Sequence, residues 1–401
     1  MTVLPVAARL RLLRSHSKRI MTSSSISEKS GSCGHGQEAV QPLATDQKSV
    51  LPNLRDAAET VPLPWDSIGR YLLGQGMHIN LERAPRQFAG GLANLNYLVE
   101  IDGLEYVLRR PPLGEVLPGA NDMAREHRVL QALAPHYRCA PRAVHYCADP
   151  AVMGTHFQIM EYRAGRVFSG AHLPQDIVVP GIGQMLTGSM VDLLVQLHSL
   201  NPAAVGLGDL GKPEGFLARA VTGWTRRAEL ASESQPHQAI RFVSTWLEKN
   251  RPPELQPTLL HADFKLDNLI LHPQTLDPVA LLDWDMSTRG DPLFDLATLL
   301  SYWTEAGDPP TMHDLGQMPT AGYGFPSRIE VVQAYARATG RDVSNLAFYR
   351  VLCTFKLSVV FMQLHARYCS GATSDPRYSR FGALSRGLLE FTHDLAQGRH
   401  A

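Results

Sequence analysis

The stretch HADFKLDN at residues 261–268 is the part of the sequence that decides the fold. It follows a run of two leucines and places five polar side chains within eight residues. Taken alone, such a stretch is equally typical of a polar surface loop on any globular protein. Its meaning therefore depends on the segments that lie before and after it.

Three of its residues stand at the spacing His-x-Asp-x-x-x-x-Asn of a kinase catalytic loop, with alanine where protein kinases have arginine. In that loop the aspartate orients the acceptor hydroxyl or takes its proton, and the asparagine binds magnesium. The spacing therefore predicts Asp263 as the catalytic residue and Asn268 as a metal ligand, because Mg²⁺ prefers hard oxygen ligands. Lys265 is predicted to neutralise the transferring phosphoryl group, and His261 to support the loop backbone.

A second acidic segment, LLDWD at residues 281–285, follows within one hairpin length. An aspartate at the end of a buried apolar strand is costly unless it is paired or binds a metal. Asp283 is therefore the second predicted Mg²⁺ ligand, and Asp285 is an alternative ligand better suited to a structural role. In the following GDPLFDLA, Asp291 is predicted to cap a helix and Asp295 to accept hydrogen bonds from the catalytic-loop backbone.

Upstream, residues 87–110 alternate between apolar and polar side chains, and the pair Asp102-Gly103 predicts a two-residue hairpin turn. Arg109 ends the second strand, where protein kinases have the lysine that clamps the phosphates. Glu126 lies on the next predicted helix and would pair with Arg109. A surface arginine and a solvated glutamate are the simpler alternative, but the order of the two residues favours a nucleotide clamp.

Two more segments are candidates for binding the nucleotide. Gly90 and Gly91 would allow backbone N–H groups to approach a phosphate, with Asn94 assisting, although a complete G-x-G-x-x-G is absent. The apolar strand that reaches Glu161 and Tyr162 is expected to bind the adenine edge through its backbone, as the hinge of a kinase does. ATP and Mg²⁺ are the cofactors that these residues imply.

The order of elements predicts an α+β protein with two lobes, as in the protein-kinase fold. Residues 1–62 have little periodicity and are predicted to be a disordered leader. Residues 63–163 should form a small β-rich nucleotide-binding lobe, and residues 164–401 a mainly helical lobe for catalysis and acceptor binding. The Pro- and Gly-rich residues 307–326 are predicted as a surface loop, and the apolar residues 351–364 as a buried core helix.

Composition and charge bear on partners and location. Lys plus Arg equals Asp plus Glu at 38 each, which argues against a nucleic-acid binder. The five cysteines show no CxxC spacing and fit free thiols in a reducing compartment. We therefore expect a cytoplasmic protein that binds a small-molecule hydroxyl acceptor and neither nucleic acid nor a membrane. Residues 1–27 lack acids and contain several arginines, so a mitochondrial location, if the protein is eukaryotic, is the alternative.

With these residues together, the chain resembles the aminoglycoside phosphotransferase-like family, and within it the kinase-like domain fused to some acyl-CoA dehydrogenases. The resemblance rests on HADFKLDN, LLDWD and GDPLFDLA, together with residues 90–110, 123–130, 160–165 and 193–198. It extends over roughly residues 65–400 and implies ATP- and Mg²⁺-dependent transfer of a phosphoryl group to a hydroxyl. It also implies that Asp263 is the base and that Asn268 and Asp283 bind the metal. In the dehydrogenase-linked branch, the acceptor is expected to be a hydroxyacyl-CoA.

Two residues depart from the family pattern. Arg109 replaces the clamping lysine, which leaves ATP affinity open, although arginine binds phosphate well and even bidentately. Ala262 stands where many antibiotic kinases carry glycine. The Ala262 departure matters little. Arg109 and the incomplete glycine loop keep a nucleotide-binding pseudokinase without turnover among the hypotheses.

The late helices bear on the acceptor. A site for polycationic aminoglycosides should be rich in carboxylates, whereas these helices carry Arg337, Arg341, Arg350, Lys356 and Arg367. The basic residues favour an anionic or neutral acceptor, with a solvated helix face as the simpler explanation. An aminoglycoside or choline-type kinase remains the alternative to a hydroxyacyl-CoA kinase.

Overall fold

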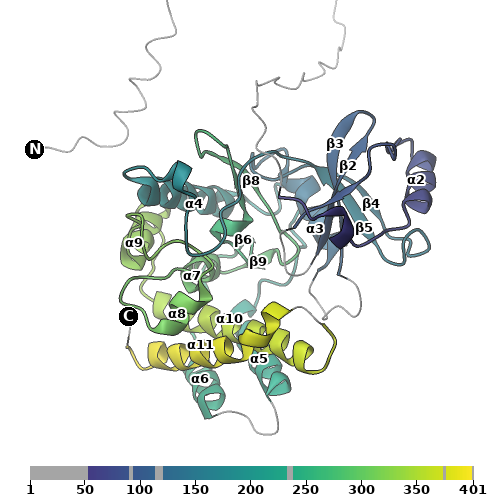
Figure 1. The fold of residues 1–401 in the computed structure, drawn as a ribbon. Helices are drawn as coiled ribbons and strands as arrows, with labels where there is room; N and C mark the ends of the chain where they lie inside the picture. The colour runs from purple at the N-terminus through teal and green to yellow at the C-terminus, as the bar shows by residue number, and fades with distance from the viewer. Residues whose placement is uncertain (1–52, 90–93, 113–120, 233–237, 374–375, 400–401) are drawn as a thin grey trace, which may run out of the picture. The chain divides into compact units, whose positions relative to one another are not determined.

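The structure is a computed structural model that describes residues 53–399, except for residues 90–93, 113–120, 233–237 and 374–375. The described chain has a β-rich part followed by a mainly helical part (Figure 1). The predicted α+β arrangement of two lobes is therefore present. Most of the predicted leader lies outside the described residues.

The first lobe is built on an antiparallel five-stranded sheet with the order β1-β2-β3-β5-β4. Asp102 and Gly103 both have positive φ, 50° and 78°, which is the backbone conformation of a type I′ hairpin turn. This turn joins β2 to β3 in the predicted hairpin. The strands are β1 (Arg86–Gln87), β2 (Leu95–Ile101), β3 (Leu104–Arg110), β4 (Ala143–Cys147) and β5 (Phe157–Glu161).

Two helices accompany this sheet, α2 (Trp65–Gly74) and α3 (Met123–Leu133). Ile68 and Leu72 of α2 share a buried apolar cluster with Tyr97 and Val99, which the two-residue period of β2 places on one face of the sheet. The end of α3 instead belongs to the apolar core of the second lobe. Helix α3, together with Ala143 of β4 and Met160 of β5, thus takes part in the packing between the two lobes.

Ordered structure begins before residue 63, the predicted start of the first lobe. Leu54 forms a β-bridge with Phe88, and the amide of Arg55 donates to the carbonyl of Gln87 at 2.8 Å. The edge of a sheet offers unpaired backbone groups, and this short segment occupies them. A short 3₁₀ helix, η2 (Ala57–Glu59), leads from it toward α2.

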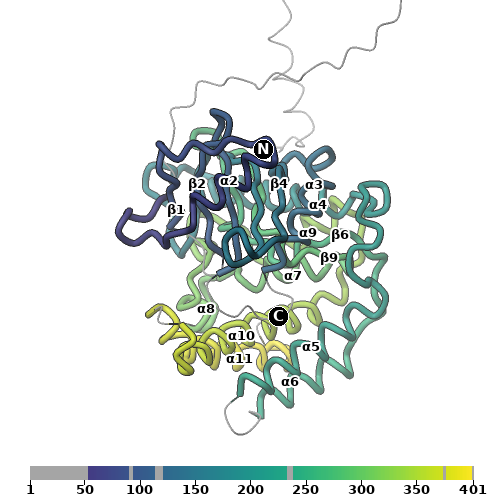
Figure 2. Tube along the Cα trace, turned by 90° about the vertical axis from the view of Figure 1, so that its right-hand side faces the viewer, coloured from purple at the N-terminus to yellow at the C-terminus, as the bar shows by residue number. Residues whose placement is uncertain are grey.

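The second lobe consists mainly of helices, and two small ribbons face the first lobe. The ribbons pair β6 (Thr258–Leu260) with β9 (Thr288–Gly290), and β7 (Leu269–Leu271) with β8 (Pro278–Leu281). Figures 1 and 2 show α5, α6, α10 and α11 on the side of this lobe away from the sheet. The helices are α4 (Ile182–Ser199), α5 (Phe216–Ala231), α6 (Gln238–Lys249), α7 (Leu293–Ser301), α8 (Pro310–Leu315), α9 (Arg328–Thr339), α10 (Leu346–Cys369) and α11 (Phe381–Ala396), with 3₁₀ turns η3 (Gln175–Ile177), η4 (Leu266–Asn268) and η5 (Pro376–Arg380).

Helix α10 is the core helix that the apolar residues 351–364 predict. It is long and apolar enough to span a bilayer, but 72% of its most apolar 18-residue stretch is buried within the protein. It packs against α7, where the Cys353 thiol donates to the carbonyl of Phe294 at 3.5 Å. Its burial fixes the position of the helices beneath the catalytic loop.

The prediction of a surface loop over residues 307–326 is wrong in part. Helix α8 forms there, and Met312, Leu315 and Met318 are buried in the core of the lobe. Proline at the first helical position is compatible with a helix start, and the glycine after the last turn adopts a positive φ of 50°. The Pro and Gly residues therefore mark the ends of a short helix.

Candidate active site

The two acidic motifs lie side by side because the two ribbons of the second lobe lead into and out of them. The catalytic loop leaves β6 and returns as β7, and β8 leads into LLDWD. The amide of Leu282 donates to the carbonyl of Asn268 at 2.8 Å, which joins the motifs directly. Ala262 and Asp283 have φ values of 66° and 69°. Such left-handed conformations cost non-glycine residues roughly 1–3 kcal/mol and cluster at functional sites.

The carboxylate of Asp263 is held on both oxygens. The hydroxyl of Tyr302 donates to Oδ1 at 3.1 Å, and the ammonium of Lys265 lies 3.2 Å from Oδ2. Burial opposes ionisation, but the ammonium groups of Lys265 and Lys356 outweigh it and lower the pKa of Asp263 below its usual value. Asp263 is therefore a fixed carboxylate that can accept a hydrogen bond from a hydroxyl group.

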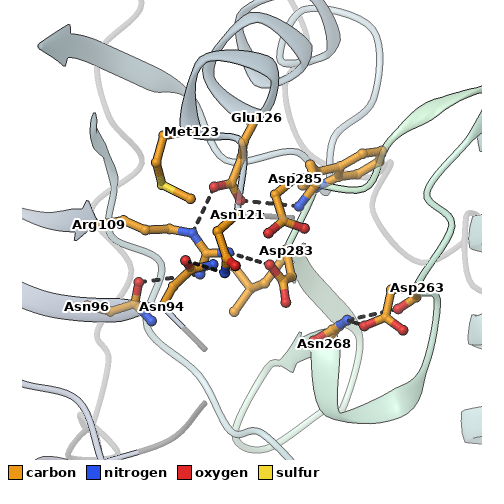
Figure 3. Close-up of polar contacts among 12 residues, drawn as sticks. Asn94, Asn96, Arg109, Asn121, Met123, Glu126, Asp263, Asn268, Asp283 and Asp285 are labelled. Atoms are coloured by element: carbon orange, nitrogen blue, oxygen red, sulfur yellow. Dashed lines mark hydrogen bonds and ion pairs between the residues drawn. The ribbon is translucent and has the colours of Figure 1, made fainter. Parts of the chain in front are cut away.

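Two side chains near this carboxylate, Asn268 and Asp283, carry oxygen atoms suited to a cation (Figure 3). Asn268 uses Nδ2 to donate to the carbonyl of Asp263 at 2.9 Å, so its Oδ1 is left to accept or to bind a cation (Figure 3). The side chain of Asp283 is 35% exposed, enough for a carboxylate oxygen to reach a ligand. Amide and carboxylate oxygens are the ligands that Mg²⁺ prefers.

The charge balance of the site also fits a cation. Asp285 is buried close to Asp283, and burial together with the Asp283 carboxylate raises the pKa of Asp285 to about 8. Neighbouring carboxylates repel one another unless a cation or a proton lies between them. Within the described residues, no three His, Cys, Asp or Glu side chains gather as a metal site.

The predicted pair of Arg109 and Glu126 is present and buried. Nε of Arg109 donates to Glu126 Oε2 at 2.7 Å, and Nη2 forms an ion pair with Asp283. The other oxygen of Glu126 accepts from the amide of Trp284 at 3.2 Å. Burial alone would lower the pKa of Arg109, but the surrounding carboxylates outweigh it and raise that pKa. The alternative interpretation, in which Arg109 lies on the surface and Glu126 is solvated, is therefore wrong.

An amide cluster lies next to this pair. Asn121 donates through Nδ2 to Asn94 Oδ1 at 2.8 Å, and Arg109 Nη1 donates to Asn96 Oδ1 at 3.3 Å (Figure 3). The structure thus brings the predicted Asn94 to Arg109 and adds two asparagines that sequence reasoning missed. The predicted Gly90 and Gly91 lie outside the described residues.

The predicted hinge follows β5. The amide of Glu161 donates to the carbonyl of Arg142 at 2.8 Å, so this N–H belongs to the sheet. The Glu161 carboxylate accepts from the Arg142 amide at 3.0 Å and from Arg163 Nη2 at 3.1 Å. The ring of Tyr162 packs 6.2 Å from that of Phe88. The Glu161 side chain therefore braces the hinge, and adenine binding by this backbone stays a prediction.

The predicted supporting residues hold the catalytic loop from below. Asp295 accepts from the amides of His261 and Ala262, both at 2.7 Å. His261 donates through Nε2 to the carbonyl of Leu282 at 2.9 Å, as a residue that braces the loop should. Asp291 accepts from the amide of Leu293 at 3.0 Å at the start of α7. The structure confirms the structural roles predicted for these side chains.

Sequence reasoning missed two side chains at the catalytic loop. Tyr302 lies at the end of α7, and its spacing from the motif carries no signal. The sequence predicts Lys356 in an acceptor wall or on a solvated helix face, but the residue is buried and donates to the carbonyl of Ala262 at 2.5 Å. A lysine within an otherwise apolar helix was the available signal, because a buried charge needs a partner.

Comparisons with known proteins agree with this geometry. Residues 85–349 match the model of a family described as the phosphotransferase enzyme family. Acyl-CoA dehydrogenase family member 10 of Mus musculus is 30% identical over 349 residues, which cover 86% of this chain and 32% of that protein. The chain thus spans about a third of the length of that relative.

Solved structures share the fold. A protein of Ralstonia eutropha assigned as an aminoglycoside phosphotransferase is 25% identical, with a TM-score of 0.69, covering 85% of this chain and 100% of that chain. An aminoglycoside phosphotransferase solved with AMP-PNP and hygromycin B is 13% identical, with a TM-score of 0.54, covering 83% and 99%. The comparisons confirm the resemblance, the two-lobed α+β fold and the enzyme class, a phosphotransferase with an alcohol group as acceptor.

Proposed function

Because the chain belongs to the phosphotransferase enzyme family, we propose that it transfers the γ-phosphoryl group of ATP, in the presence of Mg²⁺, to a hydroxyl group of a small molecule. The observation that carries this proposal is the fixed Asp263 carboxylate beside Lys265, joined through Asn268 to the segment that holds Asp283. Phosphoryl transfer needs an oriented hydroxyl, a metal site and a phosphate clamp, and these residues offer one candidate for each.

Asp263 and Lys265 act at the reacting atoms. Asp263 accepts the hydrogen bond of the acceptor hydroxyl and receives its proton as the new O–P bond forms and the bond from the γ-phosphorus to the bridging oxygen breaks. Lys265 stabilises the charge on the transferring group. Asn268 Oδ1 and the Asp283 carboxylate would hold Mg²⁺, which supplies charge neutralisation between phosphate oxygens when bound.

The first lobe holds the nucleotide. Arg109, fixed by Glu126, presents a guanidinium that can bind phosphate oxygens through parallel hydrogen bonds. Asn94 and the segment with Gly90 and Gly91 assist from the hairpin. The Glu161 carbonyl and the backbone groups of Tyr162 bind the adenine edge, because the Glu161 amide is already paired within the sheet. A structural neighbour solved with AMP-PNP supports the use of ATP by this fold.

The acceptor in this proposal is a hydroxyacyl-CoA. The name of the mouse relative supports it, because that protein is called an acyl-CoA dehydrogenase family member and is about three times as long as the matched part. The predominance of basic residues in the late helices supports an anionic acceptor. The first alternative is an aminoglycoside or choline-type acceptor. The second alternative is a nucleotide-binding pseudokinase without turnover.

We include location and partners in the proposal. The equal numbers of acidic and basic residues and the described cysteines, which are all free thiols, support a reducing cytoplasmic setting without nucleic-acid or membrane binding. A mitochondrial location is the alternative. Fractionation of cells that express the tagged chain distinguishes the two.

An acceptor screen tests the proposed function. Purified protein is incubated with Mg-ATP and a panel of hydroxyacyl-CoAs, aminoglycosides and choline, and phosphorylated products are measured by mass spectrometry. We expect a product from hydroxyacyl-CoAs that Asp263→Asn abolishes without loss of nucleotide binding. Asp66→Asn, an exposed change of the same kind on α2, should keep full activity.

Each outcome of the screen decides between the alternatives. A product from an aminoglycoside or choline alone would replace the hydroxyacyl-CoA as acceptor. Nucleotide binding without any product across the panel would favour the pseudokinase. Absence of Mg²⁺-dependent ATP binding at millimolar nucleotide would contradict the enzyme function as a whole.

A further inference from the structure

The side chain of Lys356 is a buried positive charge directly beneath the catalytic loop. The residue lies in the middle of α10, is 7% exposed, and donates through Nζ to the carbonyl of Ala262 at 2.5 Å. Its ammonium also lies 5.4 Å from the centre of the Phe294 ring, within the range of a cation–π contact. A charged group in such a place costs several kcal/mol unless other groups compensate it.

No carboxylate of the described residues forms an ion pair with Lys356, and its charge acts on the Asp263 carboxylate from a longer distance as well as on the main chain of the loop. Asp295, on the neighbouring helix α7, accepts from the amides of His261 and Ala262 on the other side of the same loop. A carboxylate and an ammonium are therefore linked through one residue of the main chain. Asp295 holds the N–H side of Ala262, and Lys356 holds its carbonyl side.

Ala262 is the residue that most needs such support. Its φ of 66° is left-handed, which a side chain disfavours and glycine does not. The carbonyl that Lys356 binds belongs to the peptide unit that continues into Asp263. A rotation of this peptide would relieve the strain at Ala262 and would also turn the carboxylate of Asp263 away from Lys265.

We propose that Lys356 is a positioning residue of phosphoryl transfer, which fixes the peptide between Ala262 and Asp263 and so directs the Asp263 carboxylate toward the acceptor hydroxyl. This inference rests on the proposed function and adds a residue to it. It also removes Lys356 from the basic residues that would contact an anionic acceptor. The remaining candidates for that contact are the arginines of the late helices.

Three variants of the full chain test this role. Lys356→Met keeps the length and apolar stem of the side chain but loses the charge and the hydrogen bond. Lys356→Arg keeps the charge and can still donate. Cys353→Ala removes a buried side chain one turn away on α10, which also contacts α7 but not the loop. Each variant is compared by kcat, by the KM of each substrate, by Tm, and by hydrogen–deuterium exchange of residues 258–268.

For Lys356→Met we expect kcat to fall about a hundredfold, since displacing a reacting group by roughly 1 Å has an effect of this size. The KM of ATP should stay within about threefold, because Lys356 acts on Asp263 and not on the nucleotide. Amides of the catalytic loop should exchange faster. Lys356→Arg should recover at least about tenfold of the lost kcat, and Cys353→Ala should lower Tm but leave kcat and loop exchange unchanged.

Other outcomes overturn the inference. If a folded Lys356→Met variant has the kcat and the loop exchange of the wild type, the contact between Lys356 and Ala262 does not position Asp263. A raised acceptor KM with unchanged kcat would return Lys356 to the acceptor wall. If Lys356→Met does not fold, Lys356→Gln, which keeps an uncharged donor, replaces it in the same comparison. A wild-type protein without phosphotransfer refutes the proposed function, while loop exchange still decides whether Lys356 holds the loop.

Discussion

At the scale of single residues, the site consists of charged side chains that each interact with two other side chains. Asp263 is held by Tyr302 and Lys265, and Arg109 bonds both Glu126 and Asp283. The spacing within the motifs predicted Asp263, Lys265 and Asp283, and the order of a strand and a helix predicted Arg109 and Glu126. Tyr302 could not be predicted in this way, since its contact depends on where α7 ends relative to the loop.

Tyr302→Phe should lower kcat about tenfold or more, because a hydrogen bond to a charged group contributes roughly 1.5–3 kcal/mol. The ring stays in place in this variant, so its contact with the Lys265 ammonium, 5.0 Å from the ring centre, is kept. Steady-state kinetics measure the effect. Tyr368→Phe, near the far end of α10, is the control that should have no effect, and an unchanged kcat in Tyr302→Phe would make its hydroxyl dispensable.

Arg109→Ala should lower the free energy of unfolding by about 3–5 kcal/mol, the usual cost of removing one partner from a buried ion pair. Glu126 is fully buried and would lose the guanidinium that compensates its charge. Arg109→Ala combined with Glu126→Gln should regain part of this loss in chemical denaturation. The KM of ATP should rise far more than that of the acceptor, and an unchanged nucleotide KM would leave Arg109 with a structural role only.

At the scale of elements, the fold follows from signals of different strength. The Asp102-Gly103 turn and the alternation of β2 predicted the hairpin correctly, because both signals are local. Strands β4, β9 and helix α8 were not predicted, since their residues are selected by packing against distant parts of the chain.

A pair of glycine substitutions tests these local rules. In Gly103→Ala and Gly188→Ala the new methyl group meets no atom within 4 Å, so only the backbone decides the outcome. Gly103 has a φ of 78°, and alanine there should destabilise the protein by roughly 1–2 kcal/mol. Gly188 lies within α4, where alanine should stabilise it by about 1 kcal/mol. Thermal unfolding gives both values, and changes of the same sign would contradict the explanation.

At the scale of the whole molecule, the site joins parts that lie far apart in the sequence. Glu126 of α3 accepts a hydrogen bond from the amide of Trp284. The first lobe therefore binds directly to the segment that carries the proposed metal ligand. The motifs indicated two lobes and which residues face one another. They could not indicate this contact between the lobes, because its donor is the backbone amide of Trp284, and almost every residue has such an amide.

Nucleotide binding should therefore stabilise the whole described unit. With Mg²⁺ and AMP-PNP at a hundred times their Kd, the unfolding free energy should rise by about 2.7 kcal/mol. Calorimetry should show this increase in the wild type and in Asp66→Asn. In Asp283→Asn, stabilisation by the nucleotide should no longer depend on Mg²⁺, and a retained Mg²⁺ dependence would exclude Asp283 as a ligand.

The bond between Lys356 and Ala262 spans 94 residues of sequence. During synthesis, the catalytic loop is complete as a sequence long before the helix that steadies it has been made, and chains fold from their N-terminus onward. The family match ends at residue 349, before Lys356. A shortened gene product that ended there would contain all the motifs but lack the hydrogen bond from Lys356 to Ala262. Intact motifs in such a fragment would therefore not predict phosphotransferase activity.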